Sequence, residues 1–308
     1  MSQPIAPPIF RARARTFWFA AQFLPAPSRS AVSGLYSFAR AVDDLVDEPG
    51  SLTTEQIRCI LSDWHAWLDA PTSPESAPDP RIAFRVLPVL VDHGVPARYL
   101  QMLVDGVASD VDQRDMASWS DLREYCFRVA SSVGLAVCHV LGAGDDPLAR
   151  AAAVDLGIAM QLTNILRDLW DDVRLGRVYL PADELAAHGS SREHLLWLGS
   201  RLAVHGASAI DAPFRELMRA QVRRARLHYE SGLEGVWRLA PDARFAILIA
   251  GRLYAAILDV IEAADYDIFS RRAATSTWLK LSSTARWWLA YRVRPSELAP
   301  LTADIVRS

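Results

Sequence analysis

The chain has 308 residues, of which 51% are hydrophobic, and its formal net charge at pH 7 is −3. A chain of this length can form one large hydrophobic core or two smaller ones, and its nearly balanced charge excludes a general attraction to nucleic acid or anionic lipid. The three cysteines, Cys59, Cys126 and Cys138, show no paired spacing, which argues against a disulfide framework or a zinc site and favours a reducing compartment.

Neither a secretory signal nor a membrane-spanning segment is expected from the sequence. Residues 1–17 contain arginines but no apolar core segment, which a secretory signal needs. The longest apolar stretch, residues 245–258, is interrupted by Arg252 and is shorter than the ~20 residues of a membrane-spanning helix. We therefore expect a cytoplasmic protein that is either soluble or peripheral on the membrane.

Helical periodicity runs through most of the sequence, whereas sustained period-2 alternation and hairpin turns are missing. Apolar residues recur at three- and four-residue intervals in segments 31–46, 53–70, 121–141, 149–173 and 243–264. Stretches rich in proline or glycine separate the helices at 25–28, 71–80, 142–147 and 180–184. No compositional shift marks a linker, so the pattern predicts a single all-α domain over residues 1–308, with roughly ten helices and frayed ends at about 1–9 and 295–308.

Alanine and glycine are frequent on the apolar faces of these helices, as in residues 134–137 and 246–251. Small side chains allow helices to pack closely, or they leave room for a long apolar ligand between the helices. Close packing is the commoner explanation, and the pattern alone leaves both open.

The first of these helices carries acidic side chains in an otherwise apolar stretch, residues 37–48. Asp43 and Asp47 are four residues apart, so they project from one face of the helix, one turn from each other. Asp44 lies between them, and Arg40 precedes it by one turn. Like charges at this spacing destabilise an isolated helix by roughly 0.2–0.5 kcal/mol, so we expect a cation nearby.

A second polar stripe follows more than one hundred residues later, in residues 161–181. Asn164, Asp168 and Asp172 fall at positions i, i+4 and i+8 and form an oxygen-bearing stripe about 12 Å long. Gln161 begins the same face. The surrounding positions are again apolar.

Two explanations fit the repeated pattern. The acids could form solvated faces that pair with Arg40, Arg167 and Arg174. Alternatively, the two turns face each other inside the bundle, where unpaired carboxylates are costly, and together hold divalent cations. Mg²⁺ typically binds one or two carboxylates together with waters and substrate phosphates, and it makes a diphosphate a better leaving group. Arginine forks, including that of Arg177, also suit phosphate oxygens.

The C-terminal third contains two further features. Tyr254 lies on the apolar face of the segment 243–264, where its hydroxyl could act on a substrate or simply be a satisfied core group. The segment 277–294 combines aromatic and basic residues, which favours either contact with a membrane surface or docking of a last helix on the bundle. The residues concerned are Trp278, Lys280, Arg286, Trp287, Trp288, Tyr291, Arg292 and Arg294.

Three stretches of this sequence resemble the signature blocks of the squalene and phytoene synthase family. They are "YSFARAVDDLVDE" (36–48), "YCFRVASSVG" (125–134) and "QLTNILRDLWDDVRLGRVYLP" (161–181). Residues 16–25 and 253–273 resemble its flanking blocks, and the likeness runs in family order from about residue 13 to 282. In the first flanking block Ala14 replaces a usual hydroxyl residue, and in the second signature block Phe127 and Ser131 replace a usual tyrosine and glycine.

This resemblance implies an all-α isoprenoid synthase bundle around a central apolar cavity. It implies that Asp43, Asp47, Asn164, Asp168 and Asp172 bind two or three Mg²⁺ ions, with Mn²⁺ as an alternative. It also implies catalytic roles for Asp43, Asp47, Asp168, Asp172 and Tyr254. The positions matching substrate-contacting residues of the family are Thr16, Phe17, Tyr36, Arg40, Tyr125, Val129, Gly134, Gln161, Asn164, Arg167, Arg177 and one of Arg271 and Arg272.

The activity implied is the head-to-head condensation of two prenyl diphosphates through a cyclopropyl diphosphate. No G-x-G-x-x-G motif follows a strand, so NADPH is not expected, and the redox-neutral product, phytoene from geranylgeranyl diphosphate, is favoured. The alternatives are a squalene, dehydrosqualene or hydroxysqualene synthase that uses farnesyl diphosphate, a terpene cyclase, and, more remotely, a non-catalytic helical assembly factor. Expected partners are prenyl diphosphates and neighbouring isoprenoid-pathway enzymes, with no nucleic acid.

Overall fold

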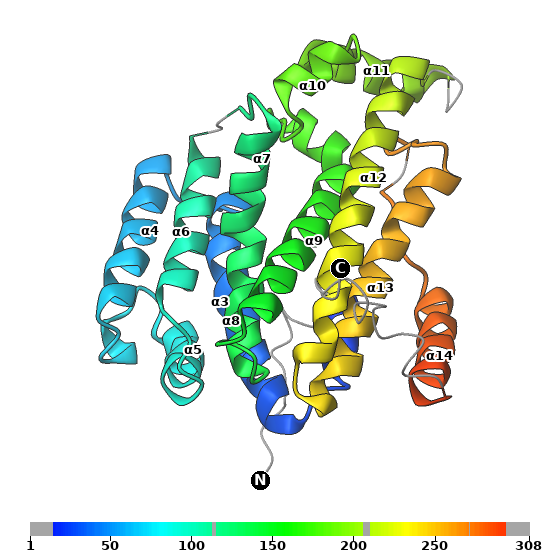
Figure 1. The fold of residues 1–308 in the computed structure, drawn as a ribbon. Coiled ribbons are helices and arrows are strands. Elements are labelled where there is room, and N and C mark those ends of the chain that lie inside the picture. The colour runs from blue at the N-terminus through cyan, green and yellow to red at the C-terminus, as the bar shows by residue number, and fades with distance from the viewer. Residues whose placement is uncertain (1–14, 113–114, 206–209, 271, 294–308) are drawn as a thin grey trace, which may run out of the picture.

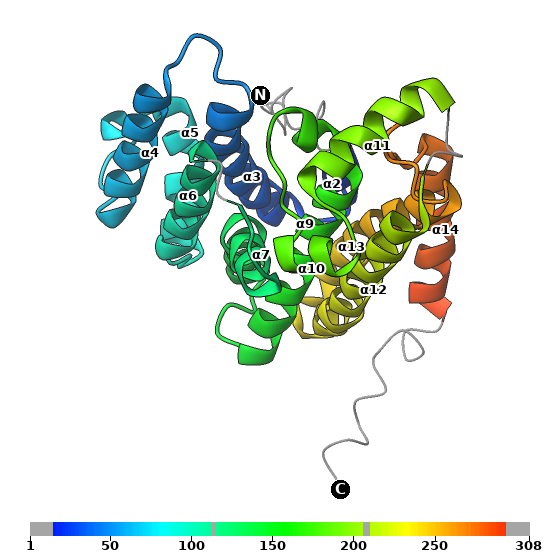
Figure 2. The ribbon, with the colours of Figure 1, turned by 90° about the horizontal axis from the view of Figure 1, so that it is seen from above.

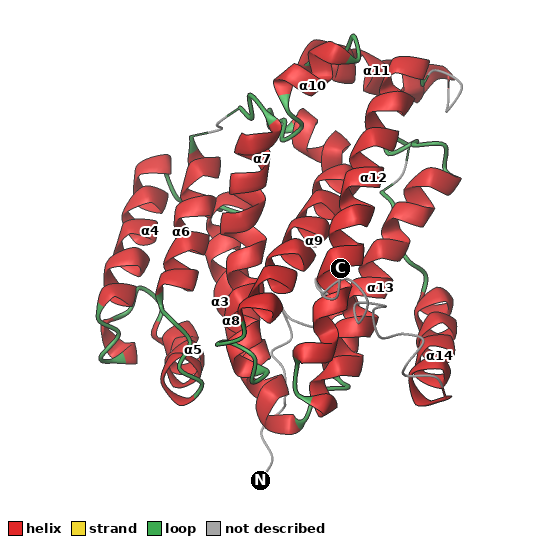
Figure 3. Ribbon diagram, in the orientation of Figure 1, coloured by secondary structure: helices red, strands yellow, loops and turns green. Residues whose placement is uncertain are grey.

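A computed structural model of the chain describes residues 15–112, 115–205, 210–270 and 272–293. These residues form helices joined by turns and loops, and none of them lies in a strand (Figure 3). The helices are α2 (Arg15–Ala21), α3 (Ala26–Asp47), α4 (Thr54–Asp69), α5 (Pro80–Asp92), α6 (Arg98–Val111), α7 (Trp119–Cys126), α8 (Ser132–Val140), α9 (Pro147–Arg174), α10 (Ala182–Ala187), α11 (Arg192–His205), α12 (Ala212–Glu234), α13 (Pro241–Ala263) and α14 (Thr277–Val293). Short helical turns add η1 (Pro74–Ser76), η2 (Phe127–Ser131) and η4 (Gly235–Arg238). The prediction of an all-α fold is confirmed.

The long helix α9 is the axis of the bundle. Figure 1 shows α3, α4, α5, α6 and α8 on one side of it and α12 and α13 on the other, with α14 at the outer edge. Buried residues of α3 to α6 and α8 form one apolar cluster with the starts of α9 and α13, and those of α7 and α10 to α12 form another with the rest of α9 and α13. Because α9 and α13 contribute to both clusters, they hold the two halves of the bundle together.

Local sequence explains where the two polar helices begin and end. At the start of α9, the Asp146 side chain accepts hydrogen bonds from the backbone N–H groups of Leu148 and Ala149, and Pro147 occupies the first turn. Past its end, Gly176 has φ = +89°, which a side chain would disfavour. Helix α3 likewise begins with a proline after its N-cap residue.

One predicted helix differs from the structure. The periodicity predicts one continuous helix over residues 121–141, but a π-helical turn, η2, separates α7 from α8. A π-turn inserts an extra residue into the helix and is typical of functional sites. Periodicity could not reveal it, because a single wide turn shifts the apolar pattern by only one position.

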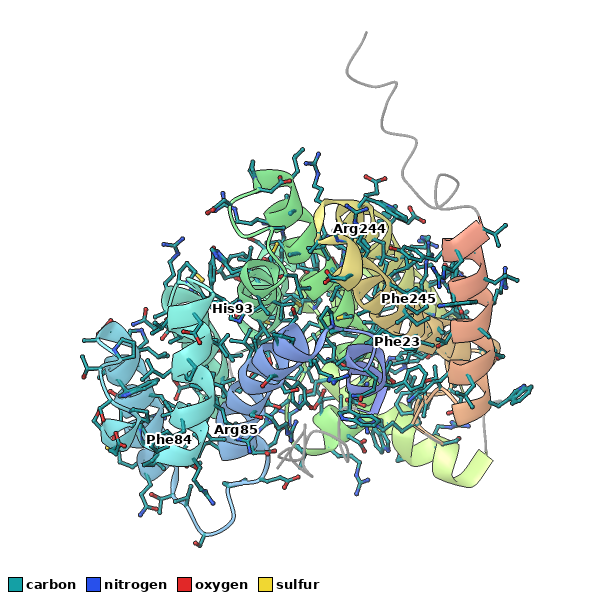
Figure 4. All side chains as sticks on the ribbon, turned by 90° about the horizontal axis from the view of Figure 1, so that it is seen from below. Phe23, Phe84, Arg85, His93, Arg244 and Phe245 are labelled. Carbon is teal, nitrogen blue, oxygen red and sulfur yellow. The ribbon has the colours of Figure 1, made fainter. Side chains whose placement is uncertain are left out.

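The N-terminal helix α2 packs across α13. Figure 4 labels Phe23, just after α2, beside Phe245 of α13, and their rings meet edge to face with centroids 5.1 Å apart. This contact brings α2, with Thr16 and Phe17, to the edge of the space enclosed by α3, α9 and α13. No helix in the described part of the chain is long and apolar enough to cross a lipid bilayer.

Candidate active site

The bundle encloses a cavity of about 960 Å³, which is at the upper end of the size range of small-molecule sites. Its walls come from α2, α3, α6 to α9 and α12 to α14, the turns η2 and η4, and the segments 177–179 and 272–275. Carboxylates and arginines line one part of it, and apolar side chains line the rest. The small residues on the apolar helix faces therefore leave room for a ligand, which was one of the two possibilities that the sequence allowed.

Every predicted site residue that the structure describes lines this cavity. They are Thr16, Phe17, Tyr36, Arg40, Asp43, Asp47, Tyr125, Val129, Gly134, Gln161, Asn164, Arg167, Asp168, Asp172, Arg177, Tyr254 and Arg272. Arg271 lies outside the described residues, as does Ala14. Arg174 does not line the cavity; its guanidinium lies 5.9 Å from the centre of the Trp170 ring.

The two acidic turns lie on different walls of the cavity and are linked by an arginine. Arg177, which follows α9, donates from Nη1 to Asp47 Oδ1 at 3.0 Å and from Nη2 to the Val46 carbonyl at 3.3 Å. These bonds tie the C-terminal end of α9 to the C-terminal end of α3. Asp43 and Asp47 keep 44% and 43% of their side chains accessible, so this end of the cavity is open.

Asp168 is the most heavily paired of these acids. Arg167 donates to both of its oxygens, at 2.9 and 2.6 Å, and Arg272 donates to the same two oxygens at 2.6 and 2.8 Å. Burial acts to raise the pKa of Asp168, but the two guanidinium groups outweigh it and hold the pKa below its ordinary value. Both arginines therefore occupy positions from which they could bind a diphosphate.

The remaining acids repel one another. Although Asp43 is accessible from the cavity, the protein atoms around it displace much of its hydration, and this desolvation, followed by the charge of Asp47, raises its pKa to about 7, even though Arg40 Nη1 lies 2.7 Å from Asp43 Oδ2. Burial and the charge of Asp168 raise the pKa of Asp172 to about 7. A bound cation would stabilise the ionised form of these crowded, partly desolvated carboxylates.

The donor set fits a hard divalent ion that is shared with a substrate. Asn164 Oδ1 is buried and has no hydrogen-bond partner among the described residues, while its Nδ2 donates to Gln161 Oε1 at 3.2 Å. Carboxylate and amide oxygens are the ligands that Mg²⁺ prefers. In the described part of the chain, no three His, Cys, Asp or Glu side chains converge into a ligand set for one ion. Phosphate oxygens and waters would therefore have to complete the coordination.

The structure adds one acid that the sequence analysis missed. Asp110 of α6 lines the cavity and accepts hydrogen bonds from the hydroxyls of Tyr125 at 2.9 Å and Tyr179 at 3.0 Å. Burial raises its pKa to about 6 in spite of these two bonds. The available signal was its place on the buried face of α6, seven residues after Leu103 and three after Val107.

The π-turn η2 brings its side chains into the cavity by close backbone contact. A Cβ on Gly157 of α9 would lie 2.5 Å from Ser131 Cα, and a Cβ on Gly106 of α6 would lie 2.7 Å from Val129 Cγ1. Glycines at both positions therefore allow η2 to fit between α6 and α9 while Val129 and Ala130 line the cavity. Ser131 does not line the cavity; its hydroxyl donates to the Val154 carbonyl at 2.7 Å.

The apolar part of the cavity follows a single face of α9. The α9 residues that line it are Ala149, Ala152, Ala153, Leu156, Gly157, Met160, Gln161, Asn164, Ile165, Arg167, Asp168 and Asp172. From Asn164 to Ala149 this face extends about 22 Å at 1.5 Å per residue. Leu141, Val236 and Leu239 line the cavity together with Ala149, so its wall there is apolar. The cavity is therefore elongated along α9, with charged side chains at one end and apolar side chains at the other, and we call this space the tube.

Comparison with known proteins agrees with this architecture. Residues 10–279 match the family model described as "Squalene/phytoene synthase". A phytoene synthase of Arthrospira platensis is 34% identical over 281 residues, which cover 87% of this chain and 86% of the relative. The 15-cis-phytoene synthase of Synechococcus elongatus is 34% identical over 283 residues, covering 88% and 87%.

Among solved structures, a dehydrosqualene synthase in complex with a ligand superposes with a TM-score of 0.76. It is 26% identical to this chain, and the match covers 92% of this chain and 95% of that one. The squalene synthase HpnC from Alicyclobacillus acidocaldarius, at 23% identity, shares the fold with a TM-score of 0.69, covering 84% and 92%. The predicted isoprenoid synthase fold is confirmed.

Proposed function

Because this chain belongs to the squalene/phytoene synthase family and is a prenyltransferase, we propose that it joins two molecules of geranylgeranyl diphosphate head to head and forms phytoene. The observation that carries the proposal is the cavity, in which two acidic helical turns and four arginines lie at one end of an apolar tube. Such a site can bind a charged diphosphate head and a long hydrocarbon tail at once.

The length of the tube supports a C20 substrate. An extended C20 prenyl chain is about 19 Å long and an extended C15 chain about 14 Å, from ordinary C–C bond lengths and angles. The apolar face of α9 between Asn164 and Ala149 offers about 22 Å. A C20 tail would therefore reach the apolar end of the cavity near Ala149, whereas a C15 tail would leave the space there empty.

We assign the metal ions to Asp43, Asp47, Asn164, Asp168 and Asp172. Mg²⁺ ions, two or three in number and replaceable by Mn²⁺, would neutralise the diphosphate and make it a leaving group when bound there. The crowding of these acids and the unpaired Asn164 oxygen support the assignment.

The arginines have a role that depends on the substrate. Arg40, Arg167, Arg177 and Arg272 are each paired with an aspartate. When a diphosphate enters, their forked donors can turn from carboxylate to phosphate oxygens, which frees the carboxylates to bind cations. The same groups then stabilise the negative charge that develops on the departing diphosphate.

The carbon chemistry takes place in the apolar part of the cavity, which excludes water from the cation. The C1–O bond of the first substrate breaks, the double bond of the second attacks C1, and loss of a proton closes a cyclopropyl diphosphate. Departure of the second diphosphate opens that ring, the two C1 carbons become joined, and loss of a second proton gives the triene. No reductant enters this balance, so we propose that NADPH is not used. Tyr254 and Tyr36 line the cavity where they can orient the reacting ends.

The competing activity is a squalene-type condensation of farnesyl diphosphate, which the likeness to a dehydrosqualene synthase structure favours. Purified protein with Mg²⁺ should be given geranylgeranyl or farnesyl diphosphate, each with and without NADPH, and the hydrocarbons identified by mass spectrometry. A C40 triene formed without NADPH supports the proposal. Product from the C15 substrate alone would reassign the enzyme, and no product from either would favour a non-catalytic helical assembly factor.

Two expectations about the surroundings of the enzyme remain predictions. One is contact with neighbouring isoprenoid-pathway enzymes, which would supply its diphosphate substrate and take up its hydrocarbon product. The other is a cytoplasmic location with peripheral contact to a membrane, where both the substrate tail and the product are most soluble.

A further inference from the structure

The last described helix, α14, exposes an unusual amount of apolar surface. Trp278 is 77% exposed and Trp288 is 47% exposed, and Leu281, Leu289 and Val293 are each more than half exposed. These five side chains are among thirteen large exposed hydrophobic side chains in the whole described structure, and they lie within one helix of 17 residues. A cluster of this kind marks an interaction surface.

The exposed residues share one face of the helix. Positions 278, 281, 285, 288 and 289 follow the three- and four-residue spacing of a single stripe, which we call the outer face of α14. The opposite face docks on the bundle through Tyr291, whose ring lies 5.5 Å from that of Phe245, and through Trp287, over which the Arg252 guanidinium lies at 4.5 Å. Figures 1 and 2 both place α14 at the outer edge of the molecule, beside α13. One face of α14 is therefore used by the fold, and the outer face is left for another surface.

The charge on this helix indicates what kind of surface binds its outer face. Residues 277–293 contain no acidic residue, in a chain whose net charge is −3, and two of their cations, Arg286 and Arg292, are exposed, while the third, Lys280, lines the cavity. The Arg292 guanidinium lies 5.2 Å from the centre of the Trp288 ring, at the border of the outer face. A second copy of the chain would bring like charges together across a twofold contact, whereas an anionic lipid surface complements the cations and accepts tryptophan at the headgroup level.

The helix is also connected directly to the cavity. The segment 272–275 and Lys280 line the cavity, and Arg272 at its start is paired with Asp168. The outer face therefore begins, at Trp278, six residues along the chain from Arg272, which lies at the polar end of the tube. That placement suits an enzyme whose substrate has a lipid tail and whose product is a hydrocarbon, and this part of the argument depends on the proposed function.

We propose that the outer face of α14 docks on the surface of an anionic lipid bilayer and lies in its headgroup region, with Trp278, Leu281 and Trp288 inserted. The contact is peripheral and reversible, since it combines a short apolar stripe with two exposed cations, Arg286 and Arg292. Its strength falls with ionic strength, because exposed charges are screened.

Vesicle flotation with the full-length protein tests the proposal. The wild-type chain should float with vesicles of equal parts phosphatidylglycerol and phosphatidylcholine, and it should bind vesicles of phosphatidylcholine alone at least about tenfold more weakly. The double variant Trp278→Ala/Trp288→Ala should lose about tenfold or more of its binding. The double variant Arg286→Gln/Arg292→Gln should lose about fivefold per cation and most of its dependence on salt.

Matched controls come from exposed residues elsewhere on the molecule. Phe84 and Leu227 are exposed apolar side chains of α5 and α12, and Arg223 is an exposed cation of α12. Phe84→Ala/Leu227→Ala and Arg223→Gln should float as the wild type does. Asp47→Ala should also float normally, because binding does not require turnover, so a failure of the proposed reaction would leave this result intact.

Two results would overturn the proposal. The first is equal binding of the wild type and the α14 variants to anionic vesicles. The second is a dimer in light scattering that the Trp278→Ala/Trp288→Ala variant converts to a monomer, since the outer face would then be an interface between copies.

Discussion

Enlarging Ala153 should shorten the product from C40 to C30. Ala153 lines the cavity eleven residues before Asn164 on α9, which places it about 16 Å from the polar end. An extended C15 tail of about 14 Å stops short of this position, whereas a C20 tail of about 19 Å passes it. In Ala153→Phe the ring would occupy the space of the last isoprene unit, and helical side chains lean toward the N-terminus of α9, away from the C15 tail.

The magnitude follows from the apolar surface that the tail would lose. Five carbons at about 0.8 kcal/mol for each buried methylene correspond to about 4 kcal/mol, or roughly a thousandfold in kcat/KM for the C20 substrate. The value for farnesyl diphosphate should change by less than about tenfold. Both are measured by competition between the two substrates in the presence of Mg²⁺, with the C30 and C40 products separated by chromatography.

A matched control and a milder variant keep the outcome interpretable. Ala151 is exposed on another face of α9, so Ala151→Phe should leave the substrate preference unchanged. α9 and α8 pack closely here, since a Cβ on Gly134 would lie 2.9 Å from the Ala153 carbonyl, so a phenylalanine could disturb the fold. The smaller substitution Ala153→Leu should fold more readily and give an intermediate shift in substrate preference. If folded Ala153→Phe kept the wild-type preference for the C20 substrate, the tail would not follow α9 and the length argument would be wrong.

Three further predictions concern the polar end and the π-turn. Asp168→Ala should lower kcat by roughly 10²–10³-fold or more while its circular dichroism spectrum stays helical, and the exposed neighbour variant Asp171→Ala should keep the wild-type rate. The pKa of Asp110 is raised to about 6 in the folded state, so the folded chain keeps a proton that the unfolded chain has lost between about pH 4 and pH 6, and stability falls as pH rises through that window. Urea unfolding at pH 4.5 and pH 7 should therefore show a smaller loss for Asp110→Asn than for the wild type, by about 2 kcal/mol, and an equal loss in both proteins would contradict this assignment. Gly157→Ala would place a Cβ against the backbone of Ser131, and should cost about 1–3 kcal/mol of unfolding free energy, whereas an unchanged melting temperature would show that η2 can move.

The predicted site residues follow from a pattern that is local in sequence. Carboxylates at i and i+4 share a helix face whatever the rest of the chain does, so Asp43 groups with Asp47, and Asn164 groups with Asp168 and Asp172, on spacing alone. Apolar periodicity similarly predicts where the helices lie, because burial on one face is a requirement of each helix separately. The resemblance to a family then indicates that the two groups act together.

Other parts of the site depend on contacts between distant segments. Asp110 joins the site only because α6 packs beside α7 and places it under the hydroxyls of Tyr125 and Tyr179, which come from two other segments. Arg272 meets Asp168 across 104 residues of chain. Neither pairing has a local signature, since the spacing between the partners is set by the loops and helices that separate them.

Residue order alone specifies that the chain is helical, that acids stand out on two helices, and that small residues mark their apolar faces. The packing of the helices specifies that these faces enclose a tube instead of packing closely, and that the π-turn η2, which contacts Gly106 and Gly157, forms part of its wall. It also specifies that α14 turns one face to the bundle and the other outward. This division arises because periodicity specifies which side of a helix is apolar, whereas the crossing and rotation of the helices specify what that side meets.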